Sequence, residues 1–360
     1  MQDKINKKLI DNLPNRFPKK IGGVTVDNPV WLAPLAGITF ASLRNFHKNL
    51  GAGLVHTEMV SAVGLYRGGR KTRELLNGIE SERPVVLQLF ASNSEEIIRG
   101  AEIALNIRKF EAIQINMACP MPKVTKKGCG SKLLENPLES YKIIKRLKTL
   151  GIPIWSKIRI IPQQREITTI DFCDNLFSAG ADFIIVHGRT ASQRYEGQAS
   201  LQEVEKVALK FPGFIGGSGD CYTPEIMMDY LKAGCTAVLA ARGALRDVFL
   251  IPKTLKMLGY CVQDCLTNPD LDAKAKLLLE LGRSVYNTEG QALALMISRR
   301  MLAALFKGFQ GATQIRRRGA LARTWSEMEE LLLNWEELSS GPKLEFTKDK
   351  FPHGVIGEFL

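Results

Sequence analysis

The chain has 360 residues, of which 45% are hydrophobic and 24% are charged, so it can form an ordinary globular protein with a sizeable core. Lys and Arg outnumber Asp and Glu by 49 to 37, and the net charge of +12 makes a polyanion such as nucleic acid the first candidate partner. The seven cysteines include no Cys-x-x-Cys pair and there are only four histidines, which excludes a zinc site and a disulfide framework.

The N-terminal segment, residues 1–20, carries charges throughout and has no apolar stretch of the kind that a signal peptide needs. No apolar run elsewhere is long enough to span a bilayer. We therefore expect a cytoplasmic protein that binds neither membrane nor metal, and we expect it to be a monomer.

Short apolar, β-branched segments alternate with helical patterns from about residue 30 to residue 258. The predicted strands are Val30–Pro34, Gly53–Met59, Pro84–Phe90, Ala112–Met117, Pro153–Arg159, Phe183–His187, Phe214–Gly217 and Ala237–Ala241.

Helix start signals lie between these strands. Ser92–Glu95 resembles a capping box, and Asn136-Pro137 and Thr223-Pro224 each place proline directly after an N-cap residue. Strands and helices that alternate in this way predict an α/β fold, a (β/α)8 TIM barrel, for which roughly 250 residues is typical. A doubly wound open sheet is the alternative, but no Gly-x-Gly-x-x-Gly follows the first strand.

The sequence after the barrel changes character. We assign residues 1–263 to the barrel domain, Asp264–Asp272 to a linker that Asn268-Pro269 breaks, residues 273–340 to a small all-α domain, and residues 341–360 to a tail.

The predicted helical domain carries a basic cluster. No acidic residue occurs between Gly290 and Ser326, whereas seven basic residues do: Arg299, Arg300, Lys307, Arg316, Arg317, Arg318 and Arg323. Such a cluster is commonly a solvated helix face. Its proximity in sequence to Phe306, Phe309 and Trp325 indicates RNA phosphate and base contacts at least as well.

Reactive groups in a TIM barrel lie at the C-terminal ends of the strands. The fourth predicted strand ends in Asn116 and runs into Cys119, in a Cys-Pro turn that a Lys- and Gly-rich loop follows. A lone cysteine is most often inert core filler. An amide that can orient a polar ring, and lysines that can meet an anion, favour a reactive thiol instead.

The last two barrel loops, Gly216–Asp220 and Ala241–Ala244, are short and glycine-rich. Loops at these positions commonly bind phosphate, here with help from Arg242, so a phosphate-bearing cofactor fits. Gln88, Lys157 and His187 can then contact an electron-accepting ring. Flavin mononucleotide (FMN) satisfies these requirements, although sugar-phosphate metabolites use the same loops.

The segment around Cys119 resembles the signature of the tRNA-dihydrouridine synthases. The matching residues are Asn116, Cys119, Pro120, Val124, Gly130, Ser131 and Leu133. The resemblance runs from about Val30 to about Leu338 and is closest to the bacterial branch with a C-terminal helical RNA-binding domain.

The resemblance implies an FMN-dependent oxidoreductase that uses NADPH to reduce the C5=C6 bond of a uridine in RNA, with tRNA as the expected partner. It implies that Cys119 is the proton donor. The implied flavin-binding residues are Pro34, Leu35, Ala36, Gln88, Lys157, His187, Ser218, Gly219, Asp220, Ala241 and Arg242. The expected RNA-binding residues are Asn116, Lys123, Arg189, Arg299, Arg300, Arg316, Arg317 and Arg318.

Three residues depart from the family pattern: Ala118 stands before the cysteine where Gly is usual, Ser218 stands for Asn, and Ala241 stands for Gly. We expect Lys123, Lys126 and Lys127 to lower the pKa of Cys119. Two alternatives stay open at this stage: a flavin barrel that acts on a small pyrimidine acid, like the dihydroorotate dehydrogenases, and an RNA-binding protein without catalysis.

Overall fold

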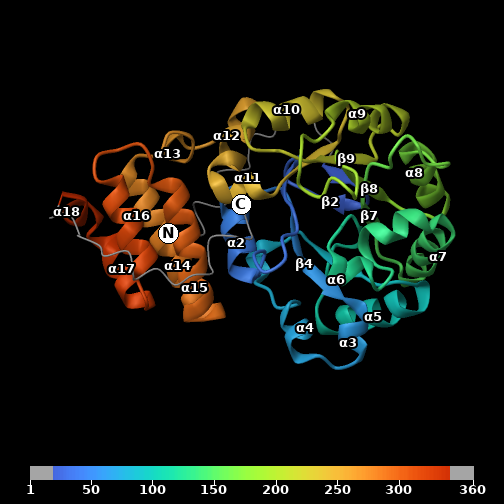
Figure 1. Ribbon diagram of the computed structural model, residues 1–360, viewed down its shortest axis with the longest axis horizontal. Helices are drawn as coiled ribbons and strands as arrows, with labels where there is room; N and C mark the ends of the chain where they lie inside the picture. The colour runs from blue at the N-terminus through green and yellow to red at the C-terminus, as the bar shows by residue number, and fades with distance from the viewer. Residues whose placement is uncertain (1–18, 341–360) are drawn as a thin grey trace. The chain divides into compact units, whose positions relative to one another are not determined.

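The structure is a computed structural model that describes residues 19–340, so the predicted tail at residues 341–360 lies outside the described residues. The chain divides into two compact units, and the boundary falls between Asp270 and Leu271 (Figure 1).

The first unit is a barrel of eight parallel strands, as the sequence predicted, and not a doubly wound sheet (Figure 1). The strands are β3 (Val30–Leu32), β4 (Val55–Ser61), β5 (Val85–Phe90), β6 (Ala112–Met117), β7 (Ile154–Arg159), β8 (Phe183–His187), β9 (Ile215–Ser218) and β10 (Ala237–Ala240). β10 pairs with β3, and the Leu32 N–H donates to the Leu54 carbonyl at 3.0 Å beside β4. These contacts close the sheet on itself.

Helices cover the outside of the barrel. They are α2 (Ala41–Asn49), α3 (Ala62–Tyr66), α4 (Arg70–Glu74), α5 (Ser94–Ile107), α6 (Pro122–Thr125), α7 (Pro137–Leu147), α8 (Thr169–Ser178), α9 (Leu201–Lys210), α10 (Pro224–Lys232), α11 (Arg242–Arg246), α12 (Leu250–Met257) and α13 (Asp264–Thr267). The last of these occupies part of the predicted linker, and Lys256 binds the Asp264 carboxylate at 2.8 Å.

Two of the three predicted helix starts are confirmed. The side chains of Asn136 and Thr223 cap α7 and α10, each with proline at the start of the helix. The third start differs, because Asn93 and not Ser92 caps α5. Ser92 instead donates its N–H and its hydroxyl to the Glu96 carboxylate, at 3.1 and 2.7 Å.

A short hairpin that the sequence did not predict closes the N-terminal end of the barrel. It consists of β1 (Lys20–Ile21) and β2 (Val24–Thr25). Ile21 and Val24 are buried with the barrel's inward-facing apolar residues, and the Trp155 indole N–H donates to the Gly22 carbonyl at 2.7 Å. The hairpin seals this end, so ligands must enter at the C-terminal ends of the strands.

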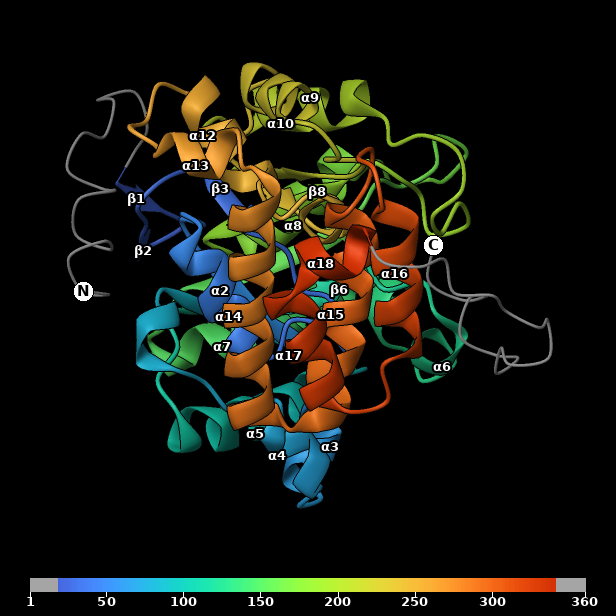
Figure 2. The same ribbon diagram turned by 90° about the vertical axis from the view of Figure 1, so that its left-hand side faces the viewer.

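The second unit is helical within its described residues, as predicted. It contains α14 (Leu271–Glu289), α15 (Gln291–Leu305), α16 (Ala312–Leu321), α17 (Trp325–Leu333) and α18 (Trp335–Ser340) (Figure 2). Phe306 is 0% exposed and Trp325 is 4% exposed, so both rings belong to the core of this unit. Of the two interpretations that the sequence left open for the basic cluster, base contacts by these two rings are not supported by their burial.

Within residues 19–340, no helix is both long enough and apolar enough to cross a membrane. The same part of the chain contains no cluster of three His, Cys, Asp or Glu side chains that could hold a metal ion.

Candidate active site

Strand register brings several predicted site residues onto neighbouring strands. Gln88 on β5 pairs with Gln114 on β6, and Asn116 pairs with Lys157 on β7. Farther round the barrel, Arg159 pairs with His187 on β8. His187 in turn pairs with Ser218 on β9. Because the strands are parallel, these residues form one polar layer toward the C-terminal end of the barrel.

Asn116 shapes the turn that carries Cys119. Its Oδ1 accepts the backbone N–H groups of Ala118 and Cys119, at 3.1 and 2.9 Å. The Cys119 carbonyl accepts the Ser131 N–H at 3.0 Å. Gly130 has φ +62°, and a Cβ there would lie 2.5 Å from that carbonyl, so only glycine fits without moving the turn.

The Cys119 thiol is half-buried, and burial raises its pKa above the ordinary value. The Met121 backbone, Arg159, Lys123 and Lys157 each lower the pKa, but by less than burial raises it. Of the three lysines expected to lower this pKa, Lys123 does so, whereas Lys126 and Lys127 do not contribute. The expected net lowering was wrong, because burial outweighs it. The thiol stays protonated at neutral pH.

Lys157 is a buried amine near this thiol. It is 9% exposed, and no hydrogen-bond acceptor is recorded for its Nζ among the residues that the structure describes. Burial, followed by repulsion from Arg159, lowers its pKa to about 7. A buried amine usually has a hydrogen-bond partner, and a ligand atom with a lone pair could be that partner here.

His187 is a neutral imidazole at the end of β8. Burial lowers its pKa well below the ordinary value, and Lys157, Arg159, Arg189 and Arg242 add to the effect. Its Nδ1 accepts the Arg189 N–H at 3.3 Å. The ring can therefore offer a hydrogen bond without adding charge.

Arg189 anchors the loop after β8. The side chain is 2% exposed and donates to the Asp220 carboxylate at 2.6 Å and to the carbonyls of Glu196 and Gly197, at 3.0 and 2.6 Å. Its Nη1 is buried and has no partner among the described residues. A role in binding RNA stays a prediction, because most of this guanidinium is used inside the protein.

The two glycine-rich loops lie against neighbouring segments. A Cβ at Gly219 would lie 2.7 Å from Ala199, and a Cβ at Gly243 would lie 1.9 Å from the Cys221 carbonyl. The Arg242 guanidinium lies 3.6 Å from the Asp220 carboxylate. Residues after β9 and β10, which were predicted to bind one phosphate, therefore do come together.

Arg159 is a site residue whose role sequence reasoning missed. It is 3% exposed, and its Nε donates to the Ala118 carbonyl at 2.7 Å. Its Nη1 donates to the carbonyls of Thr190 and Arg194, at 2.9 and 2.8 Å, which ties the cysteine turn to the loop after β8. Alternation along β7 would have placed Arg159 on the same face as Lys157.

Hydrogen bonds to Thr39 and Glu58 hold the loop after β3, which contains Pro34, Leu35 and Ala36. The Leu35 N–H donates to the Thr39 hydroxyl at 3.0 Å, and that hydroxyl donates to the Leu35 carbonyl at 3.1 Å. The Gly37 N–H donates to the Glu58 carboxylate. Pro34 and Leu35 are half-buried and Ala36 is exposed, so the loop borders the mouth of the barrel.

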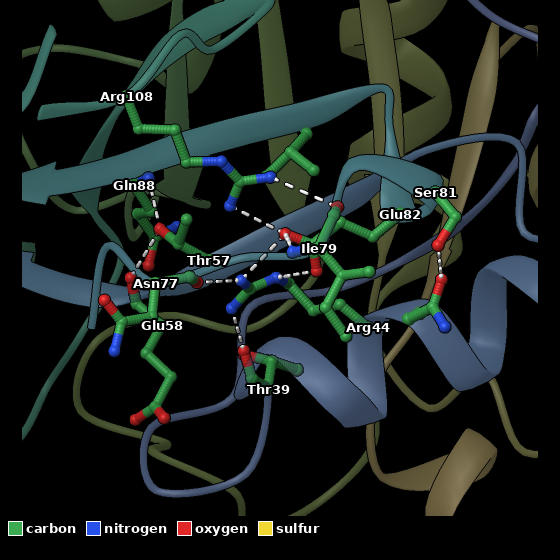
Figure 3. A network of polar contacts seen from close by, with 12 residues as sticks. Thr39, Arg44, Thr57, Glu58, Asn77, Ile79, Ser81, Glu82, Gln88 and Arg108 are labelled. Carbon is green, nitrogen blue, oxygen red and sulfur yellow. Dashed lines mark hydrogen bonds and ion pairs between the residues drawn. The ribbon is translucent and has the colours of Figure 1, made fainter. Parts of the chain in front are cut away.

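A buried ion-pair network supports this loop (Figure 3). Arg44 donates to the Glu82 carboxylate through Nε and Nη2, at 2.9 and 3.0 Å, and to the Thr39 carbonyl at 2.6 Å. Arg108 lies 2.7 Å from the same carboxylate. Neither the pairing of Arg44 with Glu82 nor its burial was visible in the sequence.

The arginines of the second unit differ in exposure. Arg299 donates to the Ala322 carbonyl, and Arg316 donates to the Ala312 carbonyl at 3.2 Å. Arg317 is exposed, whereas Arg300 and Arg318 are half-buried. Arg299 therefore has a structural role inside the unit, and Arg317 is the most accessible of the five.

Comparisons with known proteins agree on one family. The family model described as Dihydrouridine synthase (Dus) matches residues 31–339. A probable tRNA-dihydrouridine synthase of Treponema pallidum is 27% identical over 323 residues, which cover 86% of this chain and 94% of that protein. Probable tRNA-dihydrouridine synthase 1 of Synechocystis is 30% identical over 317 residues, which cover 86% of this chain and 87% of that protein. This chain belongs to the dihydrouridine synthase family.

Proposed function

We propose that this protein reduces specific uridines of tRNA to 5,6-dihydrouridine, with FMN as cofactor and NADPH as reductant. A hydride is added at C6 of the uracil ring and a proton at C5. The observation that carries the proposal is the half-buried Cys119 thiol, in a turn that Asn116 holds at the end of β6, in a chain of this family. A general acid needs its proton in place and a fixed position.

The residues at the barrel mouth fit a flavin. Arg189 presents a buried N–H donor that has no acceptor among the described residues, and the Lys157 side chain is only 9% exposed. A flavin ring and its phosphate carry acceptors for such donors. Pro34, Leu35, Ala36, Gln88, Lys157 and His187 would contact the ring, and Ser218, Gly219, Asp220, Ala241 and Arg242 would surround the phosphate. When bound, FMN supplies the hydride, which NADPH replenishes.

The residues of the chain prepare the proton transfer. Asn116 and Gly130 fix the turn, so that the thiol of Cys119 keeps one position relative to the mouth. Burial holds the proton on sulfur. Asn116 can still use its second amide N–H toward a uracil carbonyl, because only one N–H is donated to Gln88.

A polar cleft of about 420 Å³ adjoins the cysteine turn, and RNA can enter there. It lies between Pro120, Ser131, Lys132 and Glu135 on one side and Ser192, Arg194 and Glu196 on the other. A uridine in folded RNA must leave its stack to reach Cys119, at a cost of a few kcal/mol. We assign the compensating phosphate contacts to Lys123 near the cleft, and to Arg300, Arg316, Arg317 and Arg318 in the second unit.

The test is dihydrouridine formation by the purified protein with tRNA, FMN and NADPH, measured by mass spectrometry of nucleosides. A Cys119→Ala variant should bind FMN and make no product, whereas Cys265→Ala, which changes an exposed cysteine, should behave as the wild type. Normal product from Cys119→Ala would disprove the assignment of the acid.

The substrate class has its own test, in cells that lack the gene. Dihydrouridine should disappear from the tRNA fraction and stay unchanged in ribosomal RNA. Loss of dihydrouridine from ribosomal RNA alone would identify ribosomal RNA, and not tRNA, as the substrate.

A further inference from the structure

A continuous chain of hydrogen bonds runs through the barrel interior, from the cysteine turn to the backbone of β3. Asn116 Nδ2 donates to Gln88 Oε1 at 2.9 Å, and Gln88 Nε2 donates to Gln114 Oε1 at 2.6 Å. Gln114 Nε2 lies 3.4 Å from His56 Nε2, and His56 Nδ1 lies 2.8 Å from the Leu32 carbonyl oxygen. Two of these residues, His56 and Gln114, have no role in the proposed function.

The direction of this chain is fixed independently at both of its ends. At the turn, two backbone N–H groups point at the Asn116 side-chain oxygen, which makes Nδ2 the outgoing donor. At β3, the Leu32 carbonyl can only accept, so the proton of a neutral His56 must be on Nδ1. Its Nε2 is then an acceptor for Gln114. The amide orientations that both ends require are the same.

His56 is held as a neutral ring. It is 0% exposed, and its ring lies 6.4 Å from the ring centroids of both Trp31 and Trp155. Burial is the main cause that lowers its pKa, to about 4. A second proton on the ring, at Nε2, would point an N–H at the Gln114 N–H. The chain of hydrogen bonds therefore requires the neutral form of His56.

The orientations cannot change one at a time. If the Gln114 amide turned over, its N–H would face the Gln88 N–H, and Gln88 would have to turn as well. Gln88 would then present N–H to Asn116 Nδ2, and Asn116 cannot turn because two backbone N–H groups hold its oxygen. Asn116 is therefore fixed at the turn, and the acceptor on His56 is the second anchor that holds Gln114 and Gln88 in the matching orientation.

We propose that His56 and Gln114 are positioning residues that hold the Gln88 amide in the orientation in which it accepts from Asn116 and keeps its second N–H for the flavin. This inference rests on the proposed function. Both residues are fully buried, and we place neither in contact with the flavin or the uracil. Together with Lys157, which pairs with Asn116 across β6 and β7, the oriented amides present hydrogen-bond donors to an acceptor-rich edge of a ring.

Two substitutions of His56 separate this role from a merely structural one. In His56→Asn the side-chain amide can replace Nδ1 as donor to Leu32 but leaves Gln114 without an acceptor. In His56→Gln the side-chain oxygen can take the place of Nε2. Both variants are neutral, polar and no bulkier than histidine. Each carries one further cost: asparagine is one methylene smaller than glutamine, and glutamine leaves the Leu32 carbonyl without its donor.

The measurements are the melting temperature of the FMN-free protein, the Kd for FMN, and kcat and KM with tRNA. We expect the two variants to melt alike, and His56→Asn to bind FMN about tenfold more weakly or to lose about tenfold in kcat. His56→Gln should stay within about threefold of the wild type. Equal FMN affinity and equal kcat in the two variants would overturn the inference.

Gln114→Met provides a second route if the His56 variants do not fold. It removes both hydrogen bonds with little change in side-chain length, and it should reproduce the loss in FMN affinity or kcat; wild-type values would overturn the inference. A wild-type protein that binds no FMN and makes no dihydrouridine would instead refute the proposed function, which distinguishes the two failures.

Discussion

Replacing Glu82 by alanine should destabilise the barrel strongly. The carboxylate is 0% exposed and accepts two hydrogen bonds from Arg44, which is 1% exposed, and it also pairs with Arg108. Glu82→Ala leaves the Arg44 guanidinium buried with no counterion. Breaking a buried pair by removing one partner costs about 3–5 kcal/mol. For a unit of this size, that lowers the melting temperature by about 6–20 °C.

The matched control is Glu74→Ala, which removes a carboxylate from the exposed pair with Arg70, whose side chain is 92% exposed. Such pairs contribute less than about 1 kcal/mol. Differential scanning calorimetry of the full chain, supported by urea unfolding, compares the two variants. The reasoning is refuted if Glu82→Ala unfolds within about 1 kcal/mol of Glu74→Ala. A strong effect would also identify Glu82, through Arg44 and Thr39, as a support of the loop after β3.

Three further predictions concern the site and the RNA contacts. Burial lowers the pKa of Lys157 to about 7, so between pH 7 and pH 10.5 the unfolded chain binds one more proton than the folded chain. The free energy of unfolding of the FMN-free protein should rise with pH in that window, by up to about 1.4 kcal/mol per pH unit relative to Lys157→Met. Urea unfolding at pH 7 and pH 9 measures this difference, and the same change with pH in the wild type and in Lys157→Met would contradict the prediction. Arg317→Ala should reduce the slope of the logarithm of the tRNA binding constant against the logarithm of salt concentration by about 0.7–0.9. Lys206→Ala, which changes an exposed lysine on α9, should leave this slope unchanged. Equal slopes for the two variants in filter-binding titrations would show that Arg317 does not contact tRNA. Gly130→Ala should cut dihydrouridine formation about tenfold or more, because a Cβ there would lie 2.5 Å from the Cys119 carbonyl. The control is Gly128→Ala, which has a similar positive φ and a Cβ 3.3 Å from Ser92, and it should cut the rate far less. Equal rates in the two variants would show that the turn tolerates the displacement.

The strands and the polar layer at their ends were predictable, because the signal is local. Alternation with period two gives both the strand and the side chain that faces inward, and this placed Gln88, Asn116 and Lys157 correctly on neighbouring strands. The same alternation assigns His56 and Gln114 to the inward face. Their partners could not be predicted, because a hydrogen bond between strands depends on register and on the depth of each side chain in the barrel.

Features that depend on burial were less accessible from the sequence. The lysines beside Cys119 suggested a lowered thiol pKa, but all three are exposed, only Lys123 lowers the pKa, and burial of the thiol outweighs that effect. Phe306 and Trp325 lie close in sequence to basic residues, but Phe306 follows the end of α15, Trp325 begins α17, and both are buried in the core. The hairpin Lys20–Thr25 consists of two-residue strands, which are too short for a periodic pattern.

The charges at the barrel mouth explain why an anionic substrate and a protonated acid are compatible there. Lys157 and Arg159 act on both Cys119 and His187, Arg242 acts on His187, and Asp220 is the carboxylate that pairs with Arg189 and Arg242. Lys157 and Arg159 lower the pKa of the thiol, against the effect of burial. A phosphate that pairs with these cations weakens their pull on the thiol and raises its pKa further. In the proposed reaction, binding of the polyanion therefore holds the proton on Cys119 more firmly until C5 of the uracil ring accepts it.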